Sequence, residues 1–126
     1  MTVRRIVTNI ATGDLASGHA TSSARELAQA FYGDILGMQI VMDHGWITTF
    51  AADGVTAPQI SFATEGGSGA PVPDLSIEVD NFEDVLARVT ERDLAITYGP
   101  VDEPWGIRRF FLRDPFGRLV NILSHG

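Results

Sequence analysis

The chain has 126 residues, of which 44% are apolar and 20% are charged, and its formal net charge is −7. This size and composition predict one globular domain, residues 1–126, and exclude a disordered chain. The acidic balance argues against a nucleic-acid partner, which would require a basic surface. Because the sequence has no cysteine, disulfides, thiolate nucleophiles and zinc–thiolate sites are also excluded.

The sequence further predicts a cytoplasmic protein with no membrane partner. No apolar run approaches the length of about 18 residues that a membrane-spanning helix needs. The first residues lack the apolar segment and the small-residue cleavage site of a secretory signal. All nine cations are arginines, so Schiff-base chemistry on a lysine is excluded.

The first half of the chain predicts a strand and then a helix. Alternating, β-branched residues indicate a strand over 3–11, and small residues over 13–22 indicate a loop. Ser23 and Glu26 have the spacing of a capping box, and the helix is expected to end near residue 36, before Gly37. The residues spaced as its buried stripe are Leu27, Phe31 and Ile35.

Three short strands are expected after this helix, over 38–43, 46–51 and 59–63, with a turn at Asp53-Gly54 before the third. Residues 65–73 then have the composition of a linker, being rich in glycine, serine and proline.

The pattern starts again after the linker. Residues 75–79 alternate as a strand, and Asp80 with Glu83 is expected to cap a second helix. The apolar stripe of that helix consists of Phe82, Val85, Leu86 and Val89. Strands are expected over 95–98, 107–112 and 119–124, and Asp114-Pro115-Phe116-Gly117 supplies the turn between the last two.

The predicted order β-α-β-β-β occurs twice, which indicates an internal duplication. We therefore predict an α+β fold of two βαβββ modules, module one over 1–64 and module two over 74–126, separated by the linker 65–73. Each module forms a sheet with a helix on one face, and the two sheets are expected to curl into a cup. Asp74, Ser76 and Glu78 share the side of the fifth strand that faces away from the helix.

Three segments occur in a characteristic order and spacing: Phe31-Tyr32 with Ile35-Leu36-Gly37-Met38, then Val79-Asp80-Asn81, then Asp114-Pro115-Phe116-Gly117. Together they resemble the vicinal oxygen chelate superfamily, which includes glyoxalase I, ring-cleaving dioxygenases and bleomycin-resistance proteins. The resemblance implies paired βαβββ modules in a cup-shaped sheet, which members of this length complete by forming a homodimer.

In metal-dependent members, the first, fourth, fifth and eighth strands each supply one ligand, which is His, Gln or Glu. The corresponding residues here are Val7 or Asn9, then Ser61, Asp74 and Asn121. One carboxylate remains where a stable site needs three or four good donors. The resemblance therefore implies no metal site and no cofactor.

The three histidines do not restore a metal site. His19 falls in the predicted loop and His125 lies next to the last residue, and a lone histidine in such places is more often solvated than a ligand. His44, at a turn, is the one that can tip into the mouth of the cup.

Asn9, Ser61, Asp74 and Asn121 would place amides, a hydroxyl and a carboxylate on the floor of the cup. They can hold a polar organic ligand, or they can satisfy one another and ordered water. Asp74 would need an arginine partner, for which Arg108 and Arg109 are candidates.

The run Trp105-Gly106-Ile107-Arg108 is similar to the WG-x-R run of the mitomycin- and bleomycin-resistance branch. Those proteins bind a planar, polar drug between aromatic walls at a dimer interface and do no chemistry. Trp46, with Phe50, can form a second wall of this kind. The alternative is that both tryptophans belong to the core.

We therefore predict a metal-independent homodimer that binds a small aromatic or polar compound, such as an antibiotic. No residue is predicted to be catalytic. The predicted ligand-binding residues are Asn9, Trp46, Ser61, Asp74, Trp105, Arg108 and Asn121.

Three alternatives stay open from the sequence, and with them the question of whether the protein is an enzyme. The first is a metal-dependent lyase, isomerase or dioxygenase of the glyoxalase type, which would need Asp74 together with Glu78 or His44 as ligands. The second is a metal-free enzyme that uses Asp74 or Glu78 as a general base. The third is a regulatory or scaffold dimer whose cup is filled by its own side chains.

Overall fold

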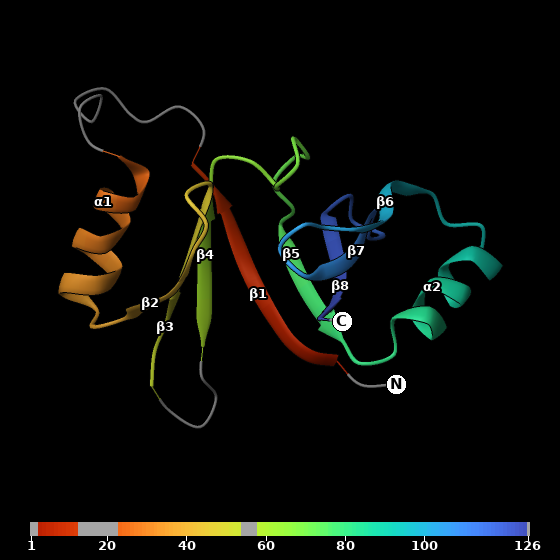
Figure 1. The fold of residues 1–126 in the computed structure, drawn as a ribbon, viewed down its shortest axis with the longest axis horizontal. Helices are drawn as coiled ribbons and strands as arrows, with labels where there is room; N and C mark the ends of the chain where they lie inside the picture. The colour runs from red at the N-terminus through yellow and green to blue at the C-terminus, as the bar shows by residue number, and fades with distance from the viewer. Residues whose placement is uncertain (1–2, 13–22, 54–57, 126) are drawn as a thin grey trace. The chain divides into compact units, whose positions relative to one another are not determined.

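A computed structural model describes residues 3–12, 23–53 and 58–125. The predicted loop 13–22, with His19, and the turn at Gly54 lie outside these residues. The elements in chain order (Figure 1) are β1 (Val3–Ala11), α1 (Ala24–Ala28), the π-helix η1 (Gln29–Ile35), β2 (Gln39–Asp43), β3 (Ile47–Ala51), β4 (Gln59–Ala63), β5 (Leu75–Val79), α2 (Phe82–Glu91), β6 (Ile96–Asp102), β7 (Ile107–Arg113) and β8 (Leu119–His125).

The chain divides into two compact units, which we describe separately. The first unit is Thr8–Val72, and the second unit combines Met1–Val7 with Pro73–Gly126. The α+β class and the repeated order β-α-β-β-β are confirmed. The predicted single domain with modules 1–64 and 74–126 stays a prediction. In the part of the chain that the structure describes, no helix is long and apolar enough to cross a membrane.

In the first unit, strands follow the order β2-β3-β4-β1. β2, β3 and β4 are antiparallel neighbours, whereas the end of β1 pairs with β4 in parallel. Parallel neighbours need a long connection, and here the helix and the β2–β3 hairpin provide it. The helix lies beside β2, β3 and β4 (Figure 1). Its first turn is closed as predicted, because the Glu26 amide donates to Ser23 Oγ over 3.0 Å.

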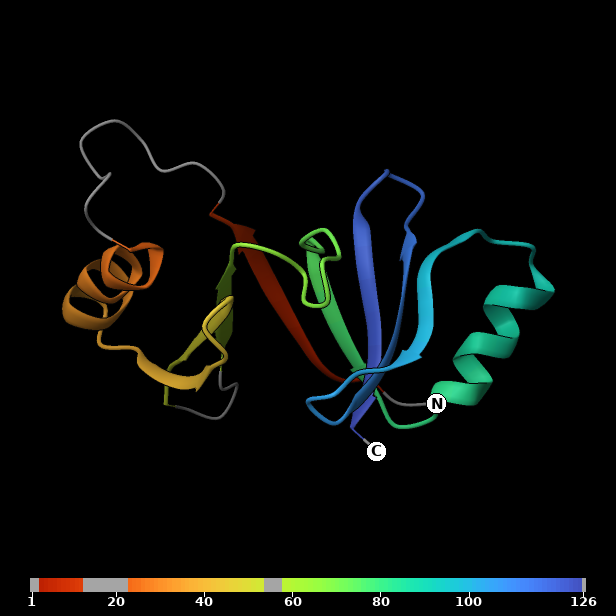
Figure 2. The same ribbon diagram turned by 45° about the horizontal axis from the view of Figure 1, so that its top comes forward.

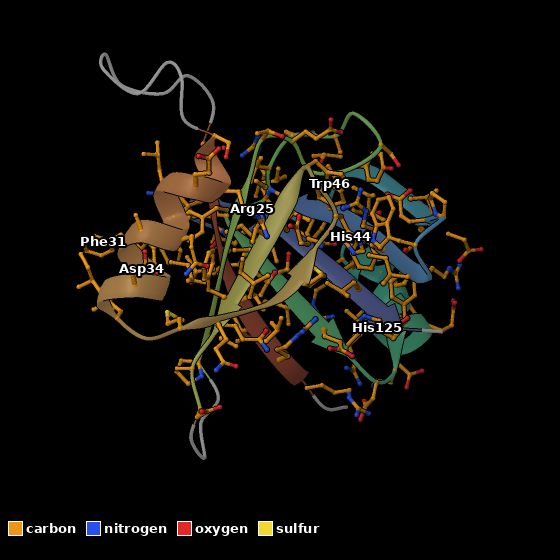
Figure 3. The ribbon with its side chains drawn as sticks, turned by 60° about the vertical axis from the view of Figure 1, so that its left-hand side comes forward. Arg25, Phe31, Asp34, His44, Trp46 and His125 are labelled. Carbon is orange, nitrogen blue, oxygen red and sulfur yellow. The ribbon has the colours of Figure 1, made fainter. Side chains whose placement is uncertain are left out.

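The buried stripe predicted for the first helix is wrong at two of its three residues, whereas the third, Leu27, is half-buried. Phe31 and Ile35 are 51% and 70% exposed, and Figure 3 shows Phe31 on the outer side of the helix, away from the strands. The contact with the sheet is made by Tyr32, whose ring lies 4.8 Å from that of Phe62 and 6.4 Å from that of Phe50. The cause is the π-helix η1: its wider turn displaces the side chains from the 3.6-residue period on which the prediction rests.

In the second unit, strands follow the order β5-β8-β7-β6. β5 and β8 are parallel, and β8, β7 and β6 are antiparallel neighbours. Figure 2 shows α2 alongside these strands. The core consists of apolar residues of α2 and of one face of the sheet, and the predicted α2 stripe is confirmed as part of it: Val79, Phe82, Val89, Phe110, Val120 and Ile122, with Val85 and Leu86 packed against them.

The predicted cap of α2 is wrong. The helix begins after Asn81, not Asp80, and no side chain caps its first turn. Asn81 Nδ2 instead lies 3.5 Å from Asp84 Oδ2. Burial of Phe82 at 6% exposure sets where the helix starts, so packing prevails over the capping pattern in the sequence.

We predict that Tyr32→Ala destabilises the protein more than Phe31→Ala does, which reverses the order expected from the sequence. Loss of the Tyr32 ring leaves a gap beside Phe50 and Phe62 and should cost about 2 kcal/mol of unfolding free energy. Phe31 is half exposed, so its loss should cost less than about 1 kcal/mol. Urea unfolding of the two variants measures the difference, and equal losses would contradict the π-helical register.

Candidate binding site

In each unit, the face of the strands that turns away from the helix carries some of the predicted polar residues. In the first unit, Asn9 lies opposite Ser61 on the parallel strands β1 and β4. Ser61 lies opposite Thr49 of β3, and their hydroxyl oxygens are 2.8 Å apart. Ser61, Thr49 and Asn9 are 2%, 4% and 8% exposed. These residues form a polar row across β1, β4 and β3, and within it the Ser61 hydroxyl is hydrogen-bonded to the Thr49 hydroxyl.

The second unit has a corresponding row of residues across β5, β8 and β7, but one polar atom in it has no hydrogen-bond partner among the described residues. Ser76 of β5 lies opposite Asn121 of β8, and Asn121 lies opposite Phe111 of β7. Asn121 Nδ2 donates to Ser76 Oγ over 3.1 Å. Asn121 is 4% exposed, and its Oδ1 accepts no hydrogen bond from any residue that the structure describes. Phe111 has no polar side-chain atom that could donate a hydrogen bond to Asn121 Oδ1. At the equivalent place in the first unit, the Thr49 hydroxyl is hydrogen-bonded to Ser61.

Ser76, and not the predicted Asp74, lies opposite Asn121 in the strand register. Asp74 precedes β5 and is exposed, and its carboxylate accepts a hydrogen bond from the Leu119 amide over 3.0 Å. No ion pair joins it to Arg108 or Arg109 among the described residues. Counting back from Val79-Asp80-Asn81 in the sequence does not identify the residue opposite Asn121, because the register between β5 and β8 determines it.

Arg108 and Arg109 lie on opposite faces of β7. The Arg108 guanidinium lies over the Phe82 ring and is paired with Glu83, so it contacts α2. Arg109 is on the same face as Phe111, and its guanidinium carbon lies 4.8 Å from the centre of that ring. The structure thus brings Arg109, and not the predicted Arg108, to the face that carries Asn121.

Trp105 belongs to the same face as Arg109. It is half-buried in the turn between β6 and β7, and its ring centre is 5.1 Å from the Arg109 guanidinium carbon. The Tyr98 ring is at the same distance from that carbon and is 5.0 Å from the Phe111 ring. The second unit therefore combines a partly exposed indole, a buried cation and a buried amide on one face.

Trp46 and Phe50 do not form one wall. Trp46 precedes β3, is half-buried, and stacks on the His44 ring with 6.0 Å between ring centres. Phe50 is fully buried against Tyr32 under the helix and belongs to the core. Trp46 therefore stays a candidate for ligand contact without Phe50. Figure 3 shows His44 and Trp46 near each other.

Glu78, which was considered as a ligand or a base, is held by basic side chains. Glu78 is 3.4 Å from Arg5 Nε and 3.0 Å from His125 Nδ1, all within the second unit. Among the described residues, no group of three or more His, Asp or Glu side chains could hold a metal ion. The residues considered for metal ligands are Asn9 and Ser61 in the first unit, and Asp74 and Asn121 in the second. Asn9, Ser61 and Asn121 carry no charge, whereas a divalent ion prefers carboxylates and imidazoles.

The turn that carries His44 and Trp46 is held at Asp43. Its carboxylate accepts a hydrogen bond from the Gly45 amide over 2.9 Å, and Arg25 Nε of α1 lies 2.7 Å from its other oxygen. The Gly45 hydrogen bond first, and then the Arg25 charge, lower the pKa of Asp43 below its ordinary value of 3.8, against the opposing effect of partial burial.

This fold is similar to that of known proteins. A model of the Glyoxalase/Bleomycin resistance protein/Dioxygenase superfamily matches residues 20–122. A solved superfamily member from Vibrio splendidus 12B01 is 20% identical, with a TM-score of 0.63 over 98% of this chain and 99% of its own. No curated protein matches the sequence significantly.

Methylmalonyl-CoA epimerases are also similar in fold. A variant of the Streptomyces coelicolor enzyme, in complex with 2-nitronate-propionyl-CoA, is 15% identical, with a TM-score of 0.66 over 99% of each chain. The Mycobacterium tuberculosis enzyme is 18% identical, with a TM-score of 0.60 over 95% of this chain and 86% of its own. Identities this low establish the fold and not the activity.

We predict that the contribution of Asp43 to stability disappears in acid. Since its folded pKa is lowered, the contribution is complete above about pH 5 and is lost as the pH falls through the folded pKa, below 3.8. Asp43→Asn should cost about 1 kcal/mol or less at pH 7, because the pair is partly exposed, and progressively less as the pH falls below 3.8. Urea unfolding from pH 7 to pH 2 tests this. Arg25→Gln should reduce the difference, and parallel curves at all pH values would contradict it.

Proposed function

Because the chain belongs to the glyoxalase/bleomycin resistance protein/dioxygenase superfamily, we propose that it binds a small aromatic or polar organic molecule without a metal ion. The observation that carries this proposal is the buried Asn121 Oδ1, which accepts no hydrogen bond from the described residues. Its neighbours are Ser76 and Phe111, a hydroxyl and an aromatic ring. Such a set suits a flat ligand that brings a hydrogen-bond donor.

The energetic argument concerns the cost of leaving Asn121 Oδ1 without a partner. More than nine in ten buried polar groups in proteins are hydrogen-bonded, and an unsatisfied one costs about 1–3 kcal/mol. Turning the amide over would let Ser76 donate to Oδ1 but would leave Nδ2 without a partner instead. In either orientation, a ligand that supplies the missing hydrogen bond removes the cost of the unsatisfied amide atom.

The proposal extends to the physiological role. A binder of planar compounds can act by sequestering a drug, as the resistance branch of the family does, and the half-buried Trp105 supports this for an antibiotic. The cytoplasmic location inferred from the composition belongs to the same proposal.

A metal-dependent lyase, isomerase or dioxygenase is less well supported. Asn9 with Ser61, and Ser76 with Asn121, occupy the parallel strand pairs of the two units and offer no charged donor. Glu78, which that alternative would use as a ligand if His44 did not serve, is engaged by Arg5 and His125.

We also propose that the protein is a homodimer joined through the first unit. Large apolar side chains are exposed at the end of the first helix and on β2: Phe31, Ile35, Leu36, Val41 and Met42 are 36–70% exposed. β2 is at the end of the strand order, so its outer edge can pair antiparallel with β2 of a second copy about a twofold axis. Contact with a second copy would also cover the stripe residues that the sequence pattern expects to be buried.

We predict that Asn121→Ala weakens ligand binding while leaving the fold intact. A panel of planar aromatic amides should raise the melting temperature of the wild type, and affinity should fall about tenfold in the variant, because the ligand loses a buried hydrogen bond. Stability without ligand should be little changed, since Ala removes the unsatisfied oxygen. Isothermal titration and thermal melts measure the two quantities.

Asn81→Ala is the matched control for this experiment. Asn81 also has a buried Oδ1 without a partner among the described residues, but it lies at the start of α2. It should leave affinity unchanged. Equal loss in both variants, or no binding by the wild type, would refute the site. In the same melts Mn²⁺, Ni²⁺ and Zn²⁺ should give no stabilisation, and stoichiometric metal with a raised melting temperature would favour the metal-dependent alternative.

We predict that Ile35→Glu dissociates the proposed dimer. Light scattering after size exclusion should give twice the chain mass of 13.6 kDa for the wild type and one chain mass for the variant, because a charge would be buried at the interface. Leu94→Glu is the control, since Leu94 is 50% exposed but lies in the second unit. A monomeric wild type, or dissociation by both variants, would contradict the assignment.

A further inference from the structure

The second unit contains a buried ion pair that the proposed site does not yet explain. Arg109 and Glu103 have side chains that are each 3% exposed. Arg109 Nε donates to Glu103 Oε2 over 2.6 Å, and Nη2 lies 2.5 Å from the same oxygen. The Tyr98 hydroxyl donates to Oε2 as well, over 2.9 Å. One carboxylate oxygen thus has three donors around it.

A pair of this kind is a poor means of stabilising a fold. Each ion costs several kcal/mol to remove from water, and apolar residues of similar volume often stabilise a protein equally well or better. The Arg109–Glu103 pair therefore invites a role other than stability, namely to position the side chains around it. Its guanidinium carbon lies 4.8–5.1 Å from the ring centres of Phe111, Tyr98 and Trp105. A cation at such distances attracts the faces of aromatic rings and so fixes their orientation.

The pair also spans the turn in which Trp105 lies. Glu103 directly follows β6 and Arg109 is the third residue of β7, so the two lie on either side of Trp105 in the hairpin. The Glu103 amide donates to the Ile107 carbonyl over 2.7 Å, and the Gly106 amide donates to the Glu103 carbonyl over 3.1 Å. Trp105 is thus held at its backbone by the turn and at its ring by Arg109. Its half-buried indole has little freedom left, which lowers the entropy cost of stacking a ligand on it.

We propose that Arg109 and Glu103 are positioning residues that hold Trp105 as a stacking platform for planar, fused-ring aromatic amides. This inference rests on the proposed function, because Asn121 supplies the polar contact of the same ligand. Phe111 connects the two parts of the face: it lies opposite Asn121 in register and against Arg109. The ligand class follows, with a flat ring system for Trp105 and an amide N–H for Asn121 Oδ1.

Trp105 emission is measured in Trp46→Phe protein, in which Trp105 is the single tryptophan, since the chain has two. Affinity is measured in protein that keeps Trp46, because Trp46 is itself a candidate for ligand contact. The variant Arg109→Met with Glu103→Gln removes both charges while keeping the volume of the side chains. Two quantities are measured: the Trp105 emission maximum with acrylamide quenching, without ligand, and the affinity for naphthalene-2-carboxamide. We expect a red shift with about twofold greater quenching, and about a tenfold loss of affinity.

Arg108→Met is the matched control. Arg108 is the next residue of the same strand and loses a contact with Phe82 and Glu83 of α2, so Trp105 emission and affinity should stay as in the parent. Unchanged Trp105 emission in the double variant, or an equal response to Arg108→Met, would overturn the inference. Should the double variant fail to fold by circular dichroism, Tyr98→Phe removes one donor to Glu103, and a smaller change in the same direction is expected.

The two measurements separate this inference from the proposed function. A response of Trp105 in a protein that binds no naphthalene-2-carboxamide supports the positioning by Arg109 and Glu103 and overturns the ligand class. Binding that persists in the double variant while Trp105 responds overturns the platform and leaves the Asn121 site standing.

Discussion

Parallel pairing between the first and the last strand of each βαβββ segment determines which side chains stand together. β1 pairs with β4, and β5 pairs with β8. Such pairs need long connections, and in both cases a helix and a hairpin intervene. The register places Asn9 beside Ser61 and Ser76 beside Asn121. Because side chains alternate across a strand, a slip of one residue would turn these polar groups towards the helix and the apolar residues away from it.

The duplicated fold determines which strand positions lie opposite one another, but not which side chains occupy them. Thr49 and Phe111 occupy equivalent places, opposite Ser61 and Asn121. In the first unit a threonine hydroxyl completes the hydrogen bonding of the row. In the second unit a phenylalanine cannot, and the larger amide of Asn121 keeps one acceptor without a partner among the described residues. Divergence at one position of the repeat is therefore the reason why we propose the second unit, and not the first, as the binding face.

Much of the fold could be predicted from residue patterns, because each pattern reports on local geometry. Alternation found the strands, the Ser23–Glu26 spacing found the helix start, and the three motifs led to the superfamily, which is confirmed. The buried stripe of the first helix failed for a physical reason. Spacing by i and i+4 assumes an α-helix, and a π-helical segment changes the period without a clear signal in the sequence.

The site was harder to predict because it depends on pairing across strands. Counting from Val79 gave Asp74, whereas register with Asn121 gives Ser76. Arg108 and Arg109 are adjacent in sequence, and a WG-x-R pattern does not tell which of them faces the helix. Glu103 was missed altogether. Its signal was an acidic residue six positions before Arg109 across a short turn, which places opposite charges side by side in a hairpin.

The two buried polar groups of the second unit differ in a way that bears on recognition. Glu103 Oε2 is surrounded by donors from Arg109 and Tyr98, so it has little capacity for a ligand. Asn121 Oδ1 has no donor from the described residues. A satisfied pair can influence a ligand through the rings that it orients, whereas an unsatisfied amide can bind one directly. In the proposed site, shape selection at Trp105 and polar selection at Asn121 would thus be separate requirements, and a ligand would have to meet both to bind well.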